Sequence, residues 1–265
     1  MSEAVEDYLK AIYKLQSGAG KVSTGALADY MRVAAPSATN MITRLVESGL
    51  LRHDRYHGVE LTVAGARAAL EVIRHHRLWE MFLTEALKVP LDQVHAEAER
   101  LEHSLSEDLE DRLDRALGHP TVDPHGDPIP SKEGTLAPSS HLTLSELAVG
   151  SPARIARVPD SDPELLRYLR DLGLLPGTWV TLLRIDPFGG PLYLRLTENP
   201  DVENVAEPRI IGHELAVQIF VDNPADGTVE PNRPADSGQP RVGPVEAVDA
   251  NRGPEGGTDA EARRR

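Results

Sequence analysis

Apolar residues recur every three or four positions through the first part of the chain, as they do on one face of a helix. In the first such segment, residues 3–17, these positions are Val5, Leu9, Ile12 and Leu15. A short helix over residues 24–32 and a third helix over residues 37–49 are expected next, followed by two strands that flank a Gly-containing turn at residues 55–58. This order predicts a winged helix-turn-helix over residues 1–71.

The third helix carries small polar side chains that can reach base edges in a DNA major groove. The DNA-binding candidates on this helix and in the wing are Pro36, Ser37, Thr39, Asn40, Arg44 and Arg55. Between Tyr30 and Gly58, four arginines stand against two acidic residues, so this region is mildly basic. DNA binding is therefore favoured over the alternative, a winged helix that docks onto a protein.

A later helical stretch, residues 95–103, carries ionisable groups where an apolar stripe is usual. At positions i, i+4, i+7 and i+8 it places His95, Glu99, Glu102 and His103. Such spacing puts all four on one face of a helix, which is expected to continue to about Leu117. Crowded carboxylates repel unless a positive charge lies among them, and Glu and His are ligands for divalent cations. A solvated acidic face with incidental histidines is the alternative.

Two further segments place potential ligands. The long helix expected over residues 63–88 carries His76 and Glu80 one turn apart. The Pro- and Gly-rich stretch that follows the ligand helix is not regular structure, and it presents Asp123 and His125 on a stiff loop. A buried His–Glu hydrogen bond and an ordinary linker are the alternatives for these two segments.

From Leu142 the pattern changes to apolar segments of strand length separated by Gly/Pro turns, with one helix over residues 162–173. Five short strands with one helix predict a small SH3-like barrel. Residues 223–265 contain no aromatic residue and little material for a core, so a disordered tail is expected there.

Composition narrows the function further. The chain has no cysteine, which excludes disulfides and thiol catalysis and fits a reducing, cytoplasmic setting. It has no apolar run of about 18 residues, so no membrane association is expected. The net charge of −14 argues against indiscriminate polyanion binding, but screening leaves the local charge of a DNA-binding face decisive. No nucleophile motif or phosphate loop is present, so an enzyme is not expected. The alternatives are a metal-dependent hydrolase and a winged-helix regulator that senses an organic ligand.

Five segments together carry a resemblance to a known family: EDYLKAIYKL, PSATNMITRLVESGLL, HHRLWEMFL, VHAEAERLEHSLSE and HPTVDPHGDPIP. In this order they resemble the metal-dependent repressors of the diphtheria toxin repressor family, most closely its manganese-responsive branch, over residues 3–222. The barrel resembles the ferrous-transport-accessory (FeoA) type, from LSELAVG to IGHELAVQIFV. The resemblance implies a homodimer that binds palindromic operator DNA when its metal sites are filled and that controls metal-homeostasis genes, without an organic substrate.

The resemblance also implies two metal sites. The first would use Asp7, Glu99, Glu102 and His103, with His76 close enough to join. The second would use Glu80, Asp123, His125 and Asp160. In the iron-type members the position of His95 serves an ancillary site, and whether His95 is a ligand in this chain is left open.

The metal is expected to be Mn(II), with Fe(II) second. Where the iron-type members have sulfur ligands this chain has Asp7 and Glu99, and replacing sulfur by carboxylate favours harder ions. Lys10 stands where some manganese regulators carry a further carboxylate, which argues against a closely spaced pair of ions. Without a cation, the carboxylates are expected to repel one another and to leave the first helix loosely held.

Pattern and resemblance together predict a mainly α N-terminal part, comprising a winged helix-turn-helix and a helical dimerisation domain, followed by a small all-β SH3-like barrel and a disordered tail. The expected domains are residues 1–71, 72–140, 141–222 and 223–265.

Overall fold

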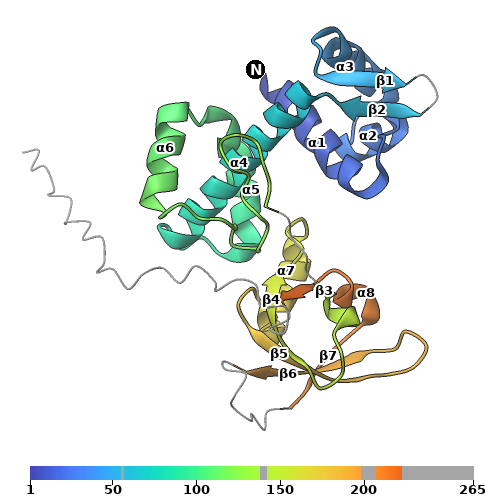
Figure 1. The fold of residues 1–265 in the computed structure, drawn as a ribbon, viewed down its shortest axis with the longest axis vertical. Helices are drawn as coiled ribbons and strands as arrows, with labels where there is room; N and C mark the ends of the chain where they lie inside the picture. The colour runs from blue at the N-terminus through green and yellow to red at the C-terminus, as the bar shows by residue number, and fades with distance from the viewer. Residues whose placement is uncertain (55–56, 138–141, 198–206, 223–265) are drawn as a thin grey trace, which may run out of the picture. The chain divides into compact units, whose positions relative to one another are not determined.

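The computed structural model describes residues 1–54, 57–137, 142–197 and 207–222 (Figure 1). Arg55, a DNA-binding candidate, and residues 223–265, the expected disordered tail, lie outside the described residues. Within the described ranges, no helix is long and apolar enough to cross a membrane.

The N-terminal part forms the expected winged helix-turn-helix. Its elements are α1 (Glu3–Ala19), α2 (Thr24–Met31), α3 (Ala35–Glu47) and the antiparallel wing strands β1 (Leu51–Asp54) and β2 (Gly58–Leu61). The Ser23 side chain caps α2 by accepting a hydrogen bond from the backbone N–H of Ala26 at 3.1 Å, and Pro36 lies in the first turn of α3. Apolar side chains from the three helices and the wing share a buried core that includes Leu9, Ile12, Leu27, Leu45 and Val59.

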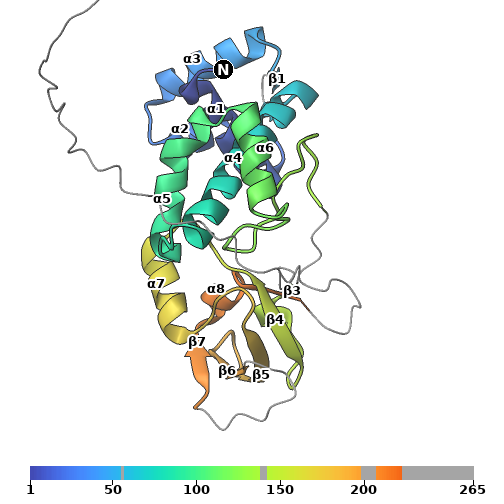
Figure 2. The same ribbon diagram turned by 90° about the vertical axis from the view of Figure 1, so that its left-hand side faces the viewer.

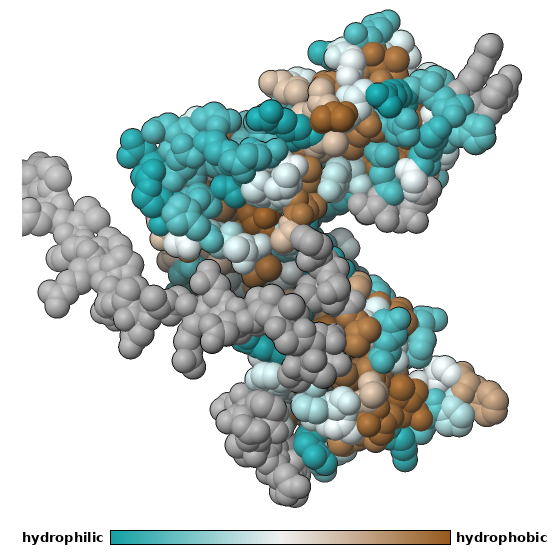
Figure 3. Space-filling view, viewed as in Figure 1, coloured by the Kyte–Doolittle hydropathy of each residue, from teal (hydrophilic) through white to brown (hydrophobic). Residues whose placement is uncertain are grey.

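The helical part follows directly. Its elements are α4 (Val63–Glu85), α5 (Leu91–Leu101), the 3-10 helix η1 (Glu102–Ser104) and α6 (Glu107–Ala116). Helix α4 contacts α1 as well as α5 and α6, and the expected boundary at residues 71–72 falls inside it. In Figure 3 the hydrophilic surface over α6 matches the density of acidic and basic residues in that helix.

The prediction of one continuous ligand helix to Leu117 is wrong. Helix α5 ends at Leu101, η1 follows, and Leu105 is extended before α6 begins. The Ser106 side chain accepts a hydrogen bond from the backbone N–H of Leu109, and acidic residues fill the first turn of α6, which is the signature of a new helix start. Glu102 and His103 therefore lie on η1, whereas His95 and Glu99 lie on α5.

The C-terminal part is an antiparallel six-stranded sheet with the order β3-β8-β4-β5-β6-β7. Its elements are β3 (Leu142–Thr143), η2 (Leu144–Glu146), β4 (Pro152–Arg157), α7 (Pro163–Leu172), β5 (Trp179–Ile185), β6 (Leu192–Thr197), β7 (Arg209–Ile211), α8 (His213–Ala216) and β8 (Phe220–Asp222). The expected SH3-like class is confirmed, but the strand count of five is wrong. Two expected strands contain a helical turn, because Thr143 and Glu146 form a capping box and His213 begins α8.

The barrel lies against the helical part at the start of α5, where α7 is its neighbour (Figure 2). Asp92 is buried there, and its two carboxylate oxygens pair with Arg170 at 2.9 Å and with Arg167 at 3.3 Å. These ion pairs connect the barrel to the helix that carries His95.

Candidate metal centre

Carboxylate and imidazole groups from α1, α4, α5, η1 and the loop after α6 form three groups, each with its ligand atoms within 4.8 Å of one another. We call them the Asp7 cluster (Asp7, Glu102, His103), the Glu80 cluster (Glu80, Asp123, His125) and the His95 group (His76, Glu80, His95). The Glu80 cluster and the His95 group share Glu80, and His76 of the His95 group hydrogen-bonds Glu102 of the Asp7 cluster.

The Asp7 cluster joins α1 to η1. His103 Nε2 lies 3.0 Å from Asp7 Oδ1 and 3.6 Å from Glu102 Oε1, while its Nδ1 lies 2.6 Å from Glu6 Oε2. Burial lowers the pKa of His103, but the hydrogen bond to Glu6 and the charges of Glu102 and Asp7 outweigh it, so the pKa is raised. Burial also raises the pKa of Asp7. Glu6 has no distinguishing signal in the sequence, because an acidic residue in the first turn of a helix is expected from the helix dipole alone.

Lys10 lies at the edge of this cluster and is buried. Its Nζ is 2.7 and 2.8 Å from the two carboxylate oxygens of Glu102, 3.4 Å from Glu99 Oε1 and 3.3 Å from His76 Nδ1. The predicted ligand Glu99 is thus placed against Lys10 and not with Asp7, and its side chain is 54% exposed. Lys10 and the imidazoles offset part of these carboxylate charges within the chain, and the expectation that α1 is loosely held without a cation stays a prediction.

The Glu80 cluster is enclosed by protein. Glu80 and His125 are fully buried, and Glu80 Oε2 lies 3.8 Å from His125 Nδ1. Neither of these two atoms has a hydrogen-bond partner among the described residues. Buried polar atoms without partners are costly, so two of them facing each other at this distance indicate a position for a bridging cation.

The loop that carries the other two ligands is fixed by the backbone. Asp123 Oδ1 accepts hydrogen bonds from the backbone N–H groups of His125 and Asp127, each at 2.9 Å, which closes the DPHG turn. The carbonyl of His125 accepts from Val158 N–H at 2.9 Å, next to β4. Gly126 has a φ of +94°, and a Cβ there would lie 1.9 Å from the Ala156 carbonyl oxygen. The turn can lie this close to the barrel only because it has glycine at that point.

The charges in the Glu80 cluster depend strongly on one another. Burial and the neighbouring Glu80 raise the pKa of Asp123 to about 7. Burial opposes protonation of His125, but the adjacent Glu80 outweighs it and raises the pKa of His125 to about 9. Burial would raise the pKa of Glu80 as well, but His125, His76 and His95 lower it. Glu80 is therefore favoured as an anion, and its neighbours are three imidazoles and the carboxyl group of Asp123.

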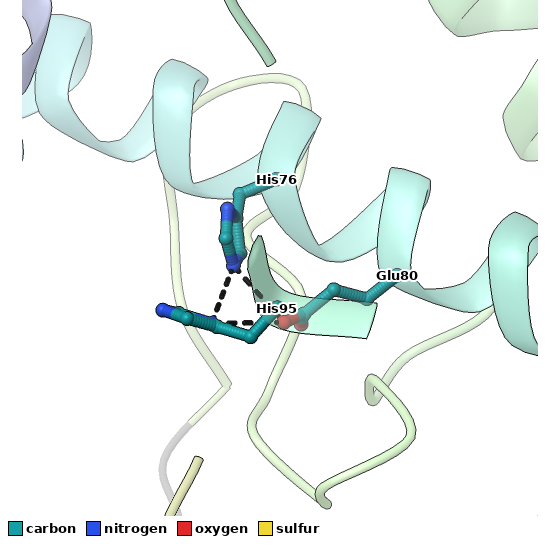
Figure 4. A group of neighbouring side chains, drawn as sticks. All are labelled: His76, Glu80 and His95. Carbon is teal, nitrogen blue, oxygen red and sulfur yellow. Dashed lines mark hydrogen bonds and ion pairs between the residues drawn. The ribbon is translucent and has the colours of Figure 1, made fainter. Parts of the chain in front are cut away.

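The His95 group connects the two clusters (Figure 4). His76 Nε2 lies 3.0 Å from both Glu80 Oε1 and His95 Nδ1, and His95 Nδ1 lies 3.1 Å from Glu80 Oε1. On its other side, His76 Nδ1 hydrogen-bonds Glu102 Oε2. Asp160 reaches this group from the segment after β4, with its Oδ2 at 4.0 Å from His95 Nδ1.

Of the three acidic residues around the start of α7, which are Asp160, Asp162 and Glu164, Asp160 is the one near the candidate ligands. Asp162 instead caps α7 by accepting from the backbone N–H groups of Glu164 and Leu165, and Glu164 is exposed in the first turn of that helix. Burial raises the pKa of Asp160, but Lys14 and His95 outweigh it, so the carboxylate is the favoured form.

The residues present fit a divalent cation. The Glu80 cluster offers two buried ligand atoms that lack a hydrogen-bond partner among the described residues, and both clusters combine carboxylate oxygens with imidazole nitrogens. This donor set suits Mn(II), Fe(II) and Zn(II), and because the chain lacks cysteine it cannot offer a thiolate.

Helix α3 has a buried apolar face and an exposed polar face. Ala38, Ile42 and Leu45 are buried in the core of the winged domain. The described DNA-binding candidates, all exposed, are Pro36, Ser37, Thr39, Asn40 and Arg44. This leaves a polar helix face with a basic residue near its C-terminal end, and the exposed wing residues Arg52 and His53 follow in β1.

Comparisons with known proteins agree with this arrangement. The description "iron dependent repressor, N-terminal DNA binding domain" matches residues 1–59, "iron dependent repressor, metal binding and dimerisation domain" matches residues 62–131, and the FeoA domain matches residues 142–223. The iron-dependent repressor IdeR of Mycobacterium leprae is 32% identical over 229 residues, which cover 82% of this chain and 97% of that protein.

Solved structures show the same similarity. A manganese-dependent transcriptional repressor in complex with manganese matches with a TM-score of 0.73 and 37% identity, over 83% of this chain and 99% of that one. The IdeR structure of T. acidophilum matches with a TM-score of 0.64 and 26% identity, over 82% of this chain and 97% of that one.

Fold, clusters and comparisons define a metal-dependent transcriptional repressor and not an enzyme. The chain belongs to the iron-dependent repressor family, which includes the diphtheria toxin repressors.

Proposed function

We propose that this chain is a homodimeric repressor that binds palindromic operator DNA when divalent metal fills the Asp7 and Glu80 clusters, with Mn(II) preferred and Fe(II) second. The genes controlled would be those of metal homeostasis. The observation that carries the proposal is the origin of the Asp7 cluster, in which α1 of the winged domain supplies one ligand and η1 supplies the other two.

We assign the ligands as follows. Asp7, Glu102 and His103 hold one ion, with Glu99 and His76 beside it. The second ion is held by a set that spans three segments: Glu80, Asp123, His125 and Asp160. His95 Nδ1 lies 3.1 Å from Glu80 Oε1 and 4.0 Å from Asp160 Oδ2, which supports a role in orienting those carboxylates.

The coupling to DNA follows from the packing of α1. Leu9 and Ile12 of this helix are fully buried in the core that also holds Leu45 of the recognition helix α3. A bound divalent ion supplies two positive charges between Asp7 and the η1 ligands. Holding Asp7 fixes α1 and, through the shared core, α3. Two recognition helices must lie about one DNA turn apart to read a palindrome, and ordering them beforehand lowers the entropic cost of binding.

The preference for Mn(II) rests on the donor atoms. Carboxylates dominate both ligand sets, and harder ions favour oxygen. Intrinsic affinity still rises toward Zn(II) in any such site, so selectivity must come from geometry and from the metal available in the cell.

The test uses metal-stripped protein and DNA duplexes selected from a random pool on Mn(II)-loaded protein. Gel shifts of a selected duplex are then titrated with Mn(II), Fe(II) or Zn(II), and the mass of the complex gives the number of chains bound. We expect an inverted repeat bound by dimers that is released by chelation. Full affinity after exhaustive chelation would refute the proposal.

A further inference from the structure

Lys10 has the surroundings of a bound cation and not those of a surface lysine. Its side chain is 8% exposed, and the carboxylate of Glu102 that it contacts is 1% exposed. An ammonium group has three N–H donors and no acceptor. Three carboxylate oxygens lie within reach of them, two on Glu102 at 2.7 and 2.8 Å and one on Glu99 at 3.4 Å.

The position of this ammonium bears directly on the Asp7 cluster. Glu102 Oε1 lies 3.6 Å from His103 Nε2, and the same oxygen accepts a hydrogen bond from Lys10 Nζ at 2.8 Å. An ion held by Glu102 and His103 must therefore share a carboxylate with a fixed positive charge. At a separation of about 4 Å in a partly buried site, two like charges repel strongly enough to lower an affinity by orders of magnitude.

Lys10 belongs to the same chain as the Asp7 cluster, so its competition with a divalent ion for Glu102 is intramolecular. Lys10 lies on α1, one helical turn after Asp7, so its ammonium is delivered to Glu102 whenever α1 packs on η1. A side chain that is already in place competes at a high effective concentration, unlike a free monovalent ion.

We propose that Lys10 is a tethered competitor of the divalent cation at the Asp7 cluster, and that it sets the metal concentration at which this cluster fills. The inference rests on the proposed function in that the Asp7 cluster takes a divalent ion. It adds that the filling threshold is set by a residue that is not itself a ligand. The same contact stabilises the chain without metal, because it pairs the buried Glu102 with a cation.

The experiment compares Lys10→Met and Lys10→Gln with Lys21→Met. Methionine keeps the length of the side chain without its charge, and glutamine keeps an N–H donor for Glu102. Lys21 is the matched control, since it pairs with Asp54 at 2.7 Å in the winged domain, away from the cluster. All three variants are made in an Asp123→Asn background, which weakens the Glu80 cluster so that binding at the Asp7 cluster can be followed. Mn(II) uptake by the metal-stripped protein is measured through the EPR signal of free Mn(II).

We expect both Lys10 variants to bind Mn(II) roughly tenfold or more tightly than the Lys21→Met control. The midpoint temperature of thermal unfolding of the metal-stripped protein should fall by several degrees for Lys10→Met and by less for Lys10→Gln. Adding Mn(II) should restore it. Equal or weaker Mn(II) affinity in a folded Lys10 variant overturns the competitor role alone. If none of the proteins takes up Mn(II), the proposed function itself is refuted.

Discussion

Neutralising Glu110 should show how strongly the helical part depends on one buried carboxylate. Glu110 of α6 is 2% exposed, and its oxygens lie 2.5 Å from Arg74 Nε and 3.3 Å from His75 Nε2 on α4. Arg74 also donates to the Pro130 carbonyl at 2.9 Å, which ties down the end of the loop that carries His125. The carboxylate therefore anchors both α6 and the loop of the Glu80 cluster.

The magnitude follows from the pKa of this group. The hydrogen bond to His75 and the charge of Arg74 outweigh burial and lower the pKa of Glu110 from its ordinary 4.5 to about 2. This difference corresponds to about 3 kcal/mol of folding free energy at neutral pH. Because the folded-state pKa is the lower one, the stabilisation is complete above pH 4.5 and is lost as the pH falls toward 2.

Urea unfolding of wild type and Glu110→Gln at pH 7, 5 and 3.5 measures this directly. We expect the variant to be less stable by up to about 3 kcal/mol at pH 7 and the gap to shrink at pH 3.5. Glu107→Gln is the control, because Glu107 lies on the same helix but its side chain is 68% exposed. A gap that does not change with pH, or a Glu110 variant as stable as the Glu107 control, would refute the reasoning.

Three further predictions concern the metal centre. Asp7→Asn should weaken Mn(II)-dependent DNA binding roughly tenfold in a gel shift, but it should lower Mn(II) occupancy less in a metal titration, because Glu102 and His103 remain. Equal losses of DNA binding and occupancy would contradict the link through α1. Zn(II) should bind more tightly than Mn(II) yet activate DNA binding less at equal occupancy, and full activation in the gel shift would contradict the geometric selectivity. Gly126→Ala should lower the free energy of unfolding by about 1 kcal/mol or more beyond the loss caused by Gly150→Ala. Gly150 is the control because it has a φ of +86° and open space at its Cβ. Equal losses would rule out a close approach of the loop to the barrel.

The winged domain could be predicted from the sequence because its signals are local. Helical periodicity, the Ser23 cap, Pro36 in the first turn of α3 and the glycine turn of the wing each act within a few residues. The ligand types followed from the density of His and carboxylate residues together with the family resemblance.

The contacts inside the site could not be predicted in the same way. Lys10 and Glu6 meet residues of η1 more than 90 positions later, and no periodicity carries that information. The break after α5 was missed because a helical stripe continues through it in the sequence, whereas the Ser106 cap and the buried Leu105 favour a new helix. In the barrel, β7 has three residues, too few for alternation to stand out.

The ring of His76 lies between the Asp7 cluster and the Glu80 cluster and contacts one carboxylate of each. One nitrogen of this imidazole faces Glu102 and the other faces Glu80 and His95. A neutral imidazole has a single hydrogen and can donate to only one side, whereas the imidazolium donates to both. The tautomer of a neutral His76 ring therefore determines whether its Nε2 presents a hydrogen or a lone pair to Glu80, and the hydrogen bond between Nδ1 and Glu102 bears on that choice. The two clusters are thus connected through a single ring, so a change in the hydrogen bonding of Glu102 changes the donor available to Glu80.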